Sequence, residues 1–242
     1  VKELKRMDRA TYQILMSIAI FRISPLREAI ADVAGLRNKF EAFDNGLARL
    51  QQLSLITEEE EEDQASSRYS MLSITRKYSL EELAANSNSY FEKEAIQRWI
   101  QWYLEYTQKH GQEDWKDWRI KYDNLTQEWE NILSVLYWCA AKEDYEKVKQ
   151  LWKNIDSYVD LNNYWHMRRH WWTWLIKQSK KRSDNLTMSE ALSEKGWTLV
   201  LMGGEFSHEA ANYLARAWKL REEANDEIKA NIANYIAVHR IV

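Results

Sequence analysis

Residues that break helices or form cross-links are scarce in this sequence of 242 residues. It contains one Pro, six Gly and one Cys. Because Pro interrupts helical hydrogen bonding and Gly weakens helices, their scarcity favours a mainly α-helical chain. A single cysteine excludes a disulfide within the chain. Cys139 lies in the apolar run ILSVLYWCAA, so we expect a buried thiol in a reducing compartment, the cytoplasm.

A large net charge and a long apolar run are also lacking. The formal net charge of -3 gives no overall attraction to nucleic acid or to an anionic membrane. No apolar stretch approaches the ~18–20 residues that a bilayer requires. The stretch YQILMSIAIF is short and has no small-residue cleavage site after it, so we interpret it as a mature helix. We expect no membrane contact.

Motifs for catalysis and metal binding are missing as well. There is no G-x-x-x-x-G-K-[ST] loop, and the adjacent glycines Gly203 and Gly204 are followed by glutamate without a lysine. His166 and His170 have the i, i+4 spacing of metal ligands, but two arginines lie between them. No Ser-His-Asp or Cys-His set can be argued from five scattered histidines. We therefore expect no catalytic residue, no metal ligand and no bound cofactor in this chain.

The first 86 residues have the order of a winged helix, which is three helices followed by a β-hairpin. The expected elements are helices near 8–21, 25–34 and 45–53, and strands near 55–57 and 69–74. The acidic run EEEEED from Glu58 to Asp63 lies between the two strands. This loop would repel phosphate where a DNA-binding wing meets the duplex, so nucleic acid is an unfavoured partner.

Short signals mark the helix ends in this part. Asp8 is a predicted N-cap, Ser24 with Pro25 predicts the start of the second helix, and Gly35 predicts its end. Thr75 predicts the start of a further helix, TRKYSLEELAA.

Residues 87–242 read as amphipathic helices joined by short connections, so sequential helices should be antiparallel neighbours. The best linker is Asn86-Ser87-Asn88-Ser89. After it we expect helices at about 90–109, 113–120, 123–141, 144–160, 163–182, 187–203, 206–223 and 226–240. The chain begins without Met and ends inside a helical pattern, and we expect it to be a fragment of a longer protein, truncated at the C-terminus of the repeat region.

A spacing of three, four and three residues recurs in this part. It relates Tyr145, Val148, Trp152 and Ile155, and again Trp165, Arg168, Trp172 and Leu175, while Ala210, Leu214 and Ala217 repeat its end. Gly196 and Gly203-Gly204 supply small residues where paired helices would approach closely. The pattern resembles an irregular tetratricopeptide-like α-solenoid. The expected fold is therefore mainly α: a winged-helix domain at 1–86 and a helical-repeat domain at 87–242.

The run from Tyr164 to Leu175 contains four tryptophans. Four indoles within ten residues point around most of a helix, so they cannot all face one core. One interpretation is that Trp165, Arg168, Arg169 and Trp172 form a partner-binding surface, because Trp with Arg is typical of binding hot spots. The alternative is that flanking helices bury both faces.

Three segments in sequence resemble the C-terminal half of a bacterial NB-ARC-type STAND ATPase. They are FDNGLARLQQLSLI, RYSMLSITRKYSLEEL and YDNLTQEWENILSVLYWCAAKEDYEKVKQLW. The resemblance implies a winged helix that follows a nucleotide-binding core, then a superhelical sensor. It implies ADP or ATP in the full-length protein, an upstream nucleotide-binding domain as a partner, and signal transduction as the function.

The family's winged helix ends on a Met-His-Asp motif whose His contacts bound ADP. The matching residues are Met71, Leu72 and Ser73. The resemblance therefore implies that Leu72 and Ser73 occupy a degenerate nucleotide-sensing position. In this interpretation the winged helix controls the nucleotide switch and the solenoid binds a protein or peptide. The alternative is a DNA-binding transcription regulator with an effector-binding repeat domain.

Overall fold

The computed structural model describes residues 6, 8–59, 67–85, 90–111 and 118–241. Contacts divide the chain into two compact units. The first unit comprises 1–110 with 117–142, and the second comprises 111–116 with 143–242. The described residues are mainly helical and contain one two-stranded antiparallel sheet, which confirms the predicted fold class. The predicted linker and most of the acidic run lie outside the described residues.

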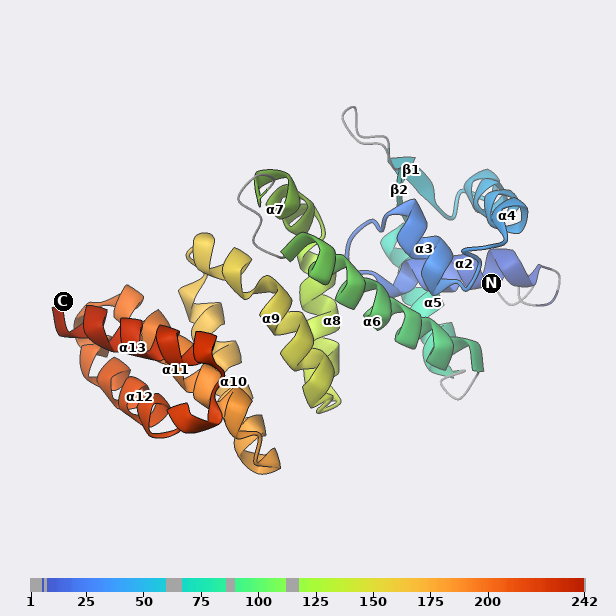
Figure 1. Ribbon diagram of the computed structural model, residues 1–242. Helices are drawn as coiled ribbons and strands as arrows, with labels where there is room; N and C mark the ends of the chain where they lie inside the picture. The colour runs from blue at the N-terminus through green and yellow to red at the C-terminus, as the bar shows by residue number, and fades with distance from the viewer. Residues whose placement is uncertain (1–5, 7, 60–66, 86–89, 112–117, 242) are drawn as a thin grey trace. The chain divides into compact units, whose positions relative to one another are not determined.

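The first unit opens with the three helices and the hairpin that the sequence predicts (Figure 1). Its first elements are α2 (Arg9–Ile20), α3 (Arg27–Val33), α4 (Phe40–Gln52), β1 (Thr57–Glu59) and β2 (Arg68–Ser70). The two strands pair with Thr57 opposite Ser70. A further antiparallel bridge joins Leu26 to Arg68. The hairpin is thereby attached to the entrance of α3.

Capping and core residues explain these elements. The Asp8 carboxylate accepts from the Thr11 amide at 3.0 Å and so caps α2 as predicted. Gly35 follows α3 in a left-handed conformation, with φ +71°. Aliphatic and aromatic side chains from all three helices and both sides of the hairpin form one core. Its fully buried members include Ile14, Leu15, Met16, Ile30 and Leu50.

Several expected boundaries in this region are wrong. The helix expected at 45–53 begins at Phe40, and the strand expected at 55–57 is Thr57–Glu59.

Two further errors lie where the hairpin meets a helix. The helix expected from Pro25 begins at Arg27, because Leu26 is extended and bonded to the hairpin. The strand expected to reach Ile74 ends at Ser70, and α5 (Ser73–Ala85) begins at Ser73. The alternation of residues 69–74 therefore spans the end of β2 and the first residues of α5, which begins two residues before the predicted start at Thr75.

Three more helices complete the first unit: α6 (Tyr90–Gly111), α7 (Trp118–Gln127) and α8 (Trp129–Ala141). The Arg98 side chain of α6 donates to the Val33 carbonyl at 3.0 Å. The Phe21 and Tyr103 rings meet edge to face with centroids 6.2 Å apart. The winged helix thus packs against helices that the sequence assigned to the repeat domain, and the domain boundary at 86/87 stays a prediction.

The second unit contains α9 (Tyr145–Leu161), α10 (Trp165–Arg182), α11 (Asn185–Met202), α12 (Ser207–Lys219) and α13 (Asp226–Ile241). Two short 3-10 turns, Gly204–Phe206 and Arg221–Glu223, flank α12. The helix expected at 206–223 is therefore shorter than predicted. Successive helices fold back on one another (Figure 1), in the solenoid-like packing that the short connections predict.

Tight turns between these helices are made largely without glycine. Glu143, Asn163 and Ser183 adopt left-handed backbone conformations, with φ between 53° and 57°. Asn tolerates this region best, and a left-handed residue after a helix lets the next amides cap its last carbonyls. Gly203 and Gly204 also have positive φ, and no atoms lie within 4 Å of the position of an added Cβ. They form a turn, so the predicted close approach at this pair is wrong.

Gly196 does mark a close approach. A Cβ placed there would lie 2.8 Å from Leu214 Cδ2 and Cγ, so α11 and α12 pack at a distance that only glycine allows. The predicted repeat residues Tyr145, Val148, Trp152 and Ile155 are all buried in α9. Around them the Trp152 ring contacts those of Trp171 and Trp172, with both centroid distances 6.0 Å.

Candidate functional site

Leu72 and Ser73, which the resemblance predicts to be a degenerate nucleotide-sensing pair, lie at the surface of the first unit. Leu72 is 65% exposed, and Ser73 is exposed at the start of α5. The Arg76 guanidinium fixes this end of α5 against α2. Its Nε donates to the Ala19 carbonyl at 3.1 Å and its Nη2 to the Phe21 carbonyl at 2.5 Å. The pair itself offers one hydroxyl and no imidazole or carboxylate.

Apolar side chains continue along the exposed side of α5. Ile74 and Tyr78 are each 62% exposed and Leu80 is 41% exposed, whereas the buried positions of α5 are Ser79 and Leu83. A cavity of about 450 Å³ opens beside Leu80, lined by Ser73, Arg76, Lys77, Leu80, Glu81 and Ala84. Because successive α-helical residues are rotated by about 100°, Ile74 and Tyr78 lie on one side of α5 and Leu80 lies on another. We call Leu72, Ile74 and Tyr78 the α5 face. An exposed apolar surface of this kind is typical of a protein contact.

A buried polar network anchors the strand that leads to the α5 face. Arg68 Nη1 of β2 lies 2.5 Å from Glu128 Oε1 and also donates to the Ser24 carbonyl at 2.8 Å. The other Glu128 oxygen accepts from the Tyr103 hydroxyl at 2.5 Å and from Asn131 Nδ2 at 2.9 Å. Burial beside this carboxylate raises the pKa of Tyr103 well above its ordinary value, so the phenol remains a donor.

Asn131 extends this network to the end of α2. Its side-chain oxygen accepts from the backbone amides of Arg22 and Ile23, at 2.8 and 3.0 Å. Helices α6 and α8 therefore hold both the end of α2 and the base of the hairpin. The sequence identified none of these residues, because a buried ion pair between residues 60 positions apart leaves no local pattern.

The predicted partner-binding set on α10 does not form one exposed surface. Arg168 and Trp172 are 3% and 1% exposed, while Trp165 and Arg169 are half-buried. Trp171 and Trp172, which lie on the two indole-bearing faces of α10, are each 1% exposed, as the alternative interpretation held. The Arg169 guanidinium lies over the Phe206 ring, 5.2 Å from its centroid. Arg168 and Trp172 are thus corrected from a partner surface to the interior of the second unit.

Arg168 instead binds carboxylates from two neighbouring helices. Its Nε and Nη2 donate to the two oxygens of Asp156, at 2.9 and 2.7 Å, and Nη2 also lies 2.8 Å from Glu194 Oε2. Asp160 contributes a third carboxylate, 3.3 Å from Nη1. The Trp172 indole donates to Asp156 Oδ1 at 3.1 Å. One guanidinium thus faces three carboxylates.

The surplus of carboxylates determines how this cluster titrates. Burial raises the pKa of Glu194 to about 7 although Arg168 opposes the shift. Burial alone would lower the pKa of Arg168. Its pKa is nevertheless raised, because the surrounding carboxylates outweigh the cost of burial. Both directions follow if Asp156 holds the guanidinium in two-point contact while Glu194 is the buried and partly surplus charge. The cluster is an internal joint between α9, α10 and α11.

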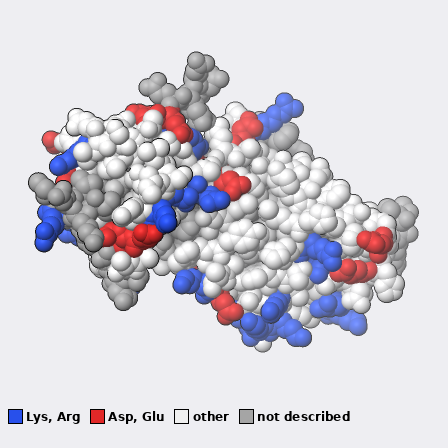
Figure 2. All heavy atoms as spheres, turned by 180° about the vertical axis from the view of Figure 1, so that it is seen from behind, with Lys and Arg blue, Asp and Glu red and all other residues white. Residues whose placement is uncertain are grey.

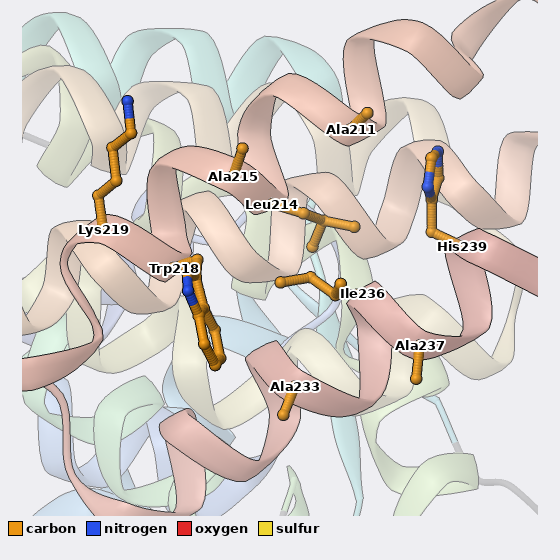
Figure 3. Close-up of a pocket in the computed structure, with 9 residues that line it drawn as sticks. All are labelled: Ala211, Leu214, Ala215, Trp218, Lys219, Ala233, Ile236, Ala237 and His239. Atoms are coloured by element: carbon orange, nitrogen blue, oxygen red, sulfur yellow. The ribbon is translucent and has the colours of Figure 1, made fainter.

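A groove between α12 and α13 in the second unit has a volume of about 610 Å³ (Figure 3). Its lining residues are Ala211, Leu214, Ala215, Trp218 and Lys219 of α12, and Ala233, Ile236, Ala237 and His239 of α13. Trp218 is 43% exposed at its edge, and the Arg221 guanidinium lies over the indole, 4.3 Å from its centroid. We call this the α12–α13 groove.

No sequence pattern predicted the α12–α13 groove. The available signal was two alanine pairs at i, i+4, Ala211 with Ala215 and Ala233 with Ala237. Alanine is common in any helix, so these pairs alone do not predict a groove. They line one because the fold places α12 beside α13.

The helix that would read DNA in a winged helix has little free positive charge. On α4, Arg49 pairs with Asp8 at 3.1 Å. Arg27 of α3 pairs with Asp44 of α4. On the face shown in Figure 2, acidic and basic side chains are interspersed among uncharged ones. These arginines are therefore already neutralised by carboxylates and are poor phosphate contacts.

The remaining candidate ligands are dispersed. Cys139 is buried as predicted. His166 and His170 are exposed on α10, and the His170 ring contacts that of Trp171. Within the described residues no group of three or more His, Cys, Asp or Glu side chains is arranged to hold a metal ion. In the same part of the chain, no helix is long and apolar enough to cross a membrane.

Comparison with known proteins gives one informative similarity. The chain is 24% identical over 165 residues to the transcription activator GutR of Bacillus subtilis (strain 168), a match that covers 65% of this chain and 19% of that protein. The chain thus spans about a fifth of the length of this relative. No protein-family model matches the chain. No solved structure matches it significantly.

Proposed function

We propose that this chain is the regulatory and sensing region of a signal-transduction ATPase of the NB-ARC-like type. The winged helix would dock on an upstream nucleotide-binding domain, and the helical repeats would bind a protein or peptide whose arrival biases that switch. The chain itself would carry no catalytic residue. ADP or ATP would be bound by the upstream domain, with Leu72 and Ser73 near the contact.

The α5 face is the observation that carries this proposal. Its exposed apolar side chains begin at Leu72, the position that the resemblance places against the nucleotide domain. The segment is held rigidly from behind by Arg76 and by the Arg68–Glu128 network. A fixed apolar surface is suited to a docking contact, since little conformational entropy is lost when it binds. Leu72 would seal such a contact without sensing the nucleotide chemically.

Nucleotide release from the full-length protein tests the α5 face. We expect Leu72→Glu combined with Tyr78→Glu to release a fluorescent ADP analogue roughly tenfold faster, because two buried charges would oppose docking. Phe40→Glu is the matched control, since Phe40 is 70% exposed on α4 and lies outside the α5 face. Equal release rates for wild type and the double variant would refute the docking role. A gene without a Walker-type loop upstream of this segment would refute the family assignment.

A second candidate is a transcription regulator, which the similarity to the activator GutR favours. In that case the winged helix would bind DNA and the repeats an effector. The neutralised arginines around α4 argue against tight phosphate contact. Binding to duplex DNA, titrated with salt, separates the two. We expect weak binding even at about 50 mM salt and a shallow salt dependence, whereas a steep one would favour the regulator.

A further inference from the structure

The contacts of α12 show how a helix packs in the second unit. Its side chains reach both α10 and α11. Glu209 lies 3.8 Å from Arg169 of α10 and 3.9 Å from Lys195 of α11. Leu214 fills the space left by Gly196 of α11. Helix α12 thus packs on α11 at a glycine, and its carboxylate Glu209 lies between two cations of α10 and α11.

The next pair of helices leaves a comparable groove open. α13 packs on α11, where the Tyr235 and Trp197 rings stack 4.7 Å apart and the Tyr235 hydroxyl donates to Glu194 at 3.1 Å. It also packs on α12 through a core that contains Ala217, Ile228 and Ile232. Figure 3 shows the outer sides of α12 and α13 with alanines along both. In the solenoid order this groove is where a further helix would lie.

The lining of the α12–α13 groove suits a helix. Ala211 with Ala215 and Ala233 with Ala237 form two rows at i, i+4 spacing, and short side chains allow a close interaxial distance. Leu214 and Ile236 form the floor between them, and Trp218 stands at one end. Trp at the margin of an apolar groove is typical of a binding hot spot.

The charge at the groove indicates what the helix must carry. Lys219 and His239 are its ionisable lining residues. His239 is engaged with Ser207, whose carbonyl lies 3.0 Å from Nε2. No carboxylate among the described residues forms an ion pair with Lys219, which is exposed. A carboxylate on the bound helix would complement this lysine, as Glu209 complements Arg169 and Lys195.

We propose that the α12–α13 groove binds an amphipathic α-helix of a partner protein. That helix would present a stripe of alternating small and large apolar residues to the groove and an acidic residue to Lys219. This assignment rests on the proposed sensing function and gives its partner a chemical class. It does not depend on the α5 face, so either can fail alone.

A labelled helical peptide tests the groove on the complete 242-residue chain. The probe is a stapled copy of residues 207–219, the helix that occupies the comparable site within the same unit. We expect saturable binding by fluorescence anisotropy and a loss of at least about tenfold in Ala215→Arg, which blocks the groove. Asn212→Arg is the matched control, because Asn212 is exposed on α12 and does not line the groove.

Charge exchange tests the acidic contact. A peptide with Glu209→Lys should bind several-fold more weakly, and Lys219→Glu in the chain should recover it. Unchanged circular dichroism shows that each variant is folded. Absence of saturable binding, or equal binding by Ala215→Arg and wild type, overturns the proposal.

Other occupants give different results. Self-association that Ala215→Arg abolishes, measured by light scattering, assigns the groove to a second copy and overturns the partner proposal. So does loss of peptide binding in the longer protein, where a neighbouring segment would fill the groove. In each case the nucleotide-release experiment on the α5 face is unaffected.

Discussion

Arg68 and Glu128 meet in the interior of the first unit, where each charge depends on the other. Glu128 is fully buried and Arg68 is 5% exposed. Two further donors, Tyr103 and Asn131, satisfy the carboxylate. Such a pair fixes geometry more than it adds stability, because desolvation offsets much of the attraction. Its role here is to hold the base of the hairpin next to the α5 face.

Removal of one partner should therefore be costly. We expect Arg68→Ala to lower the free energy of unfolding by about 3–5 kcal/mol, since Glu128 would remain buried without its cation. Urea denaturation measures the change. Arg49→Ala, which breaks the exposed pair with Asp8, should cost less than about 1 kcal/mol. Similar losses in both variants would contradict the view that the Arg68–Glu128 pair is structural.

Glu194 makes the free energy of unfolding depend on pH. Its pKa is raised to about 7 in the folded chain from an ordinary 4.5, so the folded state holds this proton more tightly. The stabilisation is complete below about pH 4.5 and is lost as the pH rises through 7, amounting to on the order of 3 kcal/mol. Glu194→Gln should remove this slope between pH 5 and 8, measured by urea denaturation. The exposed carboxyl variant Glu227→Gln should keep it, and parallel curves for Glu194→Gln and wild type would exclude the assignment.

Individual helices depend on contacts that a helix cannot provide for itself. Asp184 caps α11 by accepting from the Thr187 amide at 3.0 Å, and it also accepts from the Tyr145 hydroxyl of α9 at 2.8 Å. These hydrogen bonds lower the pKa of Asp184 to about 2 against the cost of burial. Asp184 therefore caps α11 and also joins the start of α11 to α9.

Asp184→Ala should reduce the unfolding free energy by about 1–2 kcal/mol at pH 7, the usual cost of a lost N-cap. Because the folded pKa is depressed, the difference between wild type and variant should vanish as the pH falls from about 4 to about 2. Asp184→Asn retains a capping oxygen and should lose less. A wild-type advantage that persisted undiminished at pH 2 would contradict the role of the ionised carboxylate.

Gly196 tests the packing between α11 and α12. Ala is intrinsically better in a helix than Gly by about 1 kcal/mol, yet we expect Gly196→Ala to destabilise by roughly 1–3 kcal/mol because its Cβ would overlap Leu214. The double variant with Leu214→Ala should recover part of this loss, as a double-mutant cycle in denaturant would show. Strictly additive effects would mean that the close approach is not responsible.

Across the whole molecule, the division into two compact units differs from the division read from the sequence. The winged helix shares its unit with α6, α7 and α8 through Phe21–Tyr103, Arg98 and the Arg68–Glu128 pair. A fragment of residues 1–86 would leave Arg68 without its carboxylate and would expose Phe21.

Fragments decide between the two divisions. We expect residues 1–142 to unfold cooperatively and at a higher denaturant concentration than residues 1–86, because only the longer fragment contains α6 and α8. Circular dichroism in urea provides the comparison. Equal midpoints would support an independent domain that ends at 86.

The sequence by itself determined the secondary structure class, the winged-helix order and the repeating buried face of α9, because these follow from local spacing and from the scarcity of Pro and Gly. The nucleotide-sensing role of Leu72 and Ser73, which the resemblance implies, stays a prediction. Boundaries shifted where a distant residue intervened, as Arg68 did at the start of α3.

Only the tertiary structure decided which charged and apolar groups are buried. Arg168 has the composition of a hot spot in the sequence, yet carboxylates from α9 and α11 surround it. Leu72 and Trp218 are apolar but exposed, and the alanines of α12 and α13 line a groove. Local sequence specifies the face of a helix on which a side chain lies, and the surface that covers that face depends on residues far away in the chain.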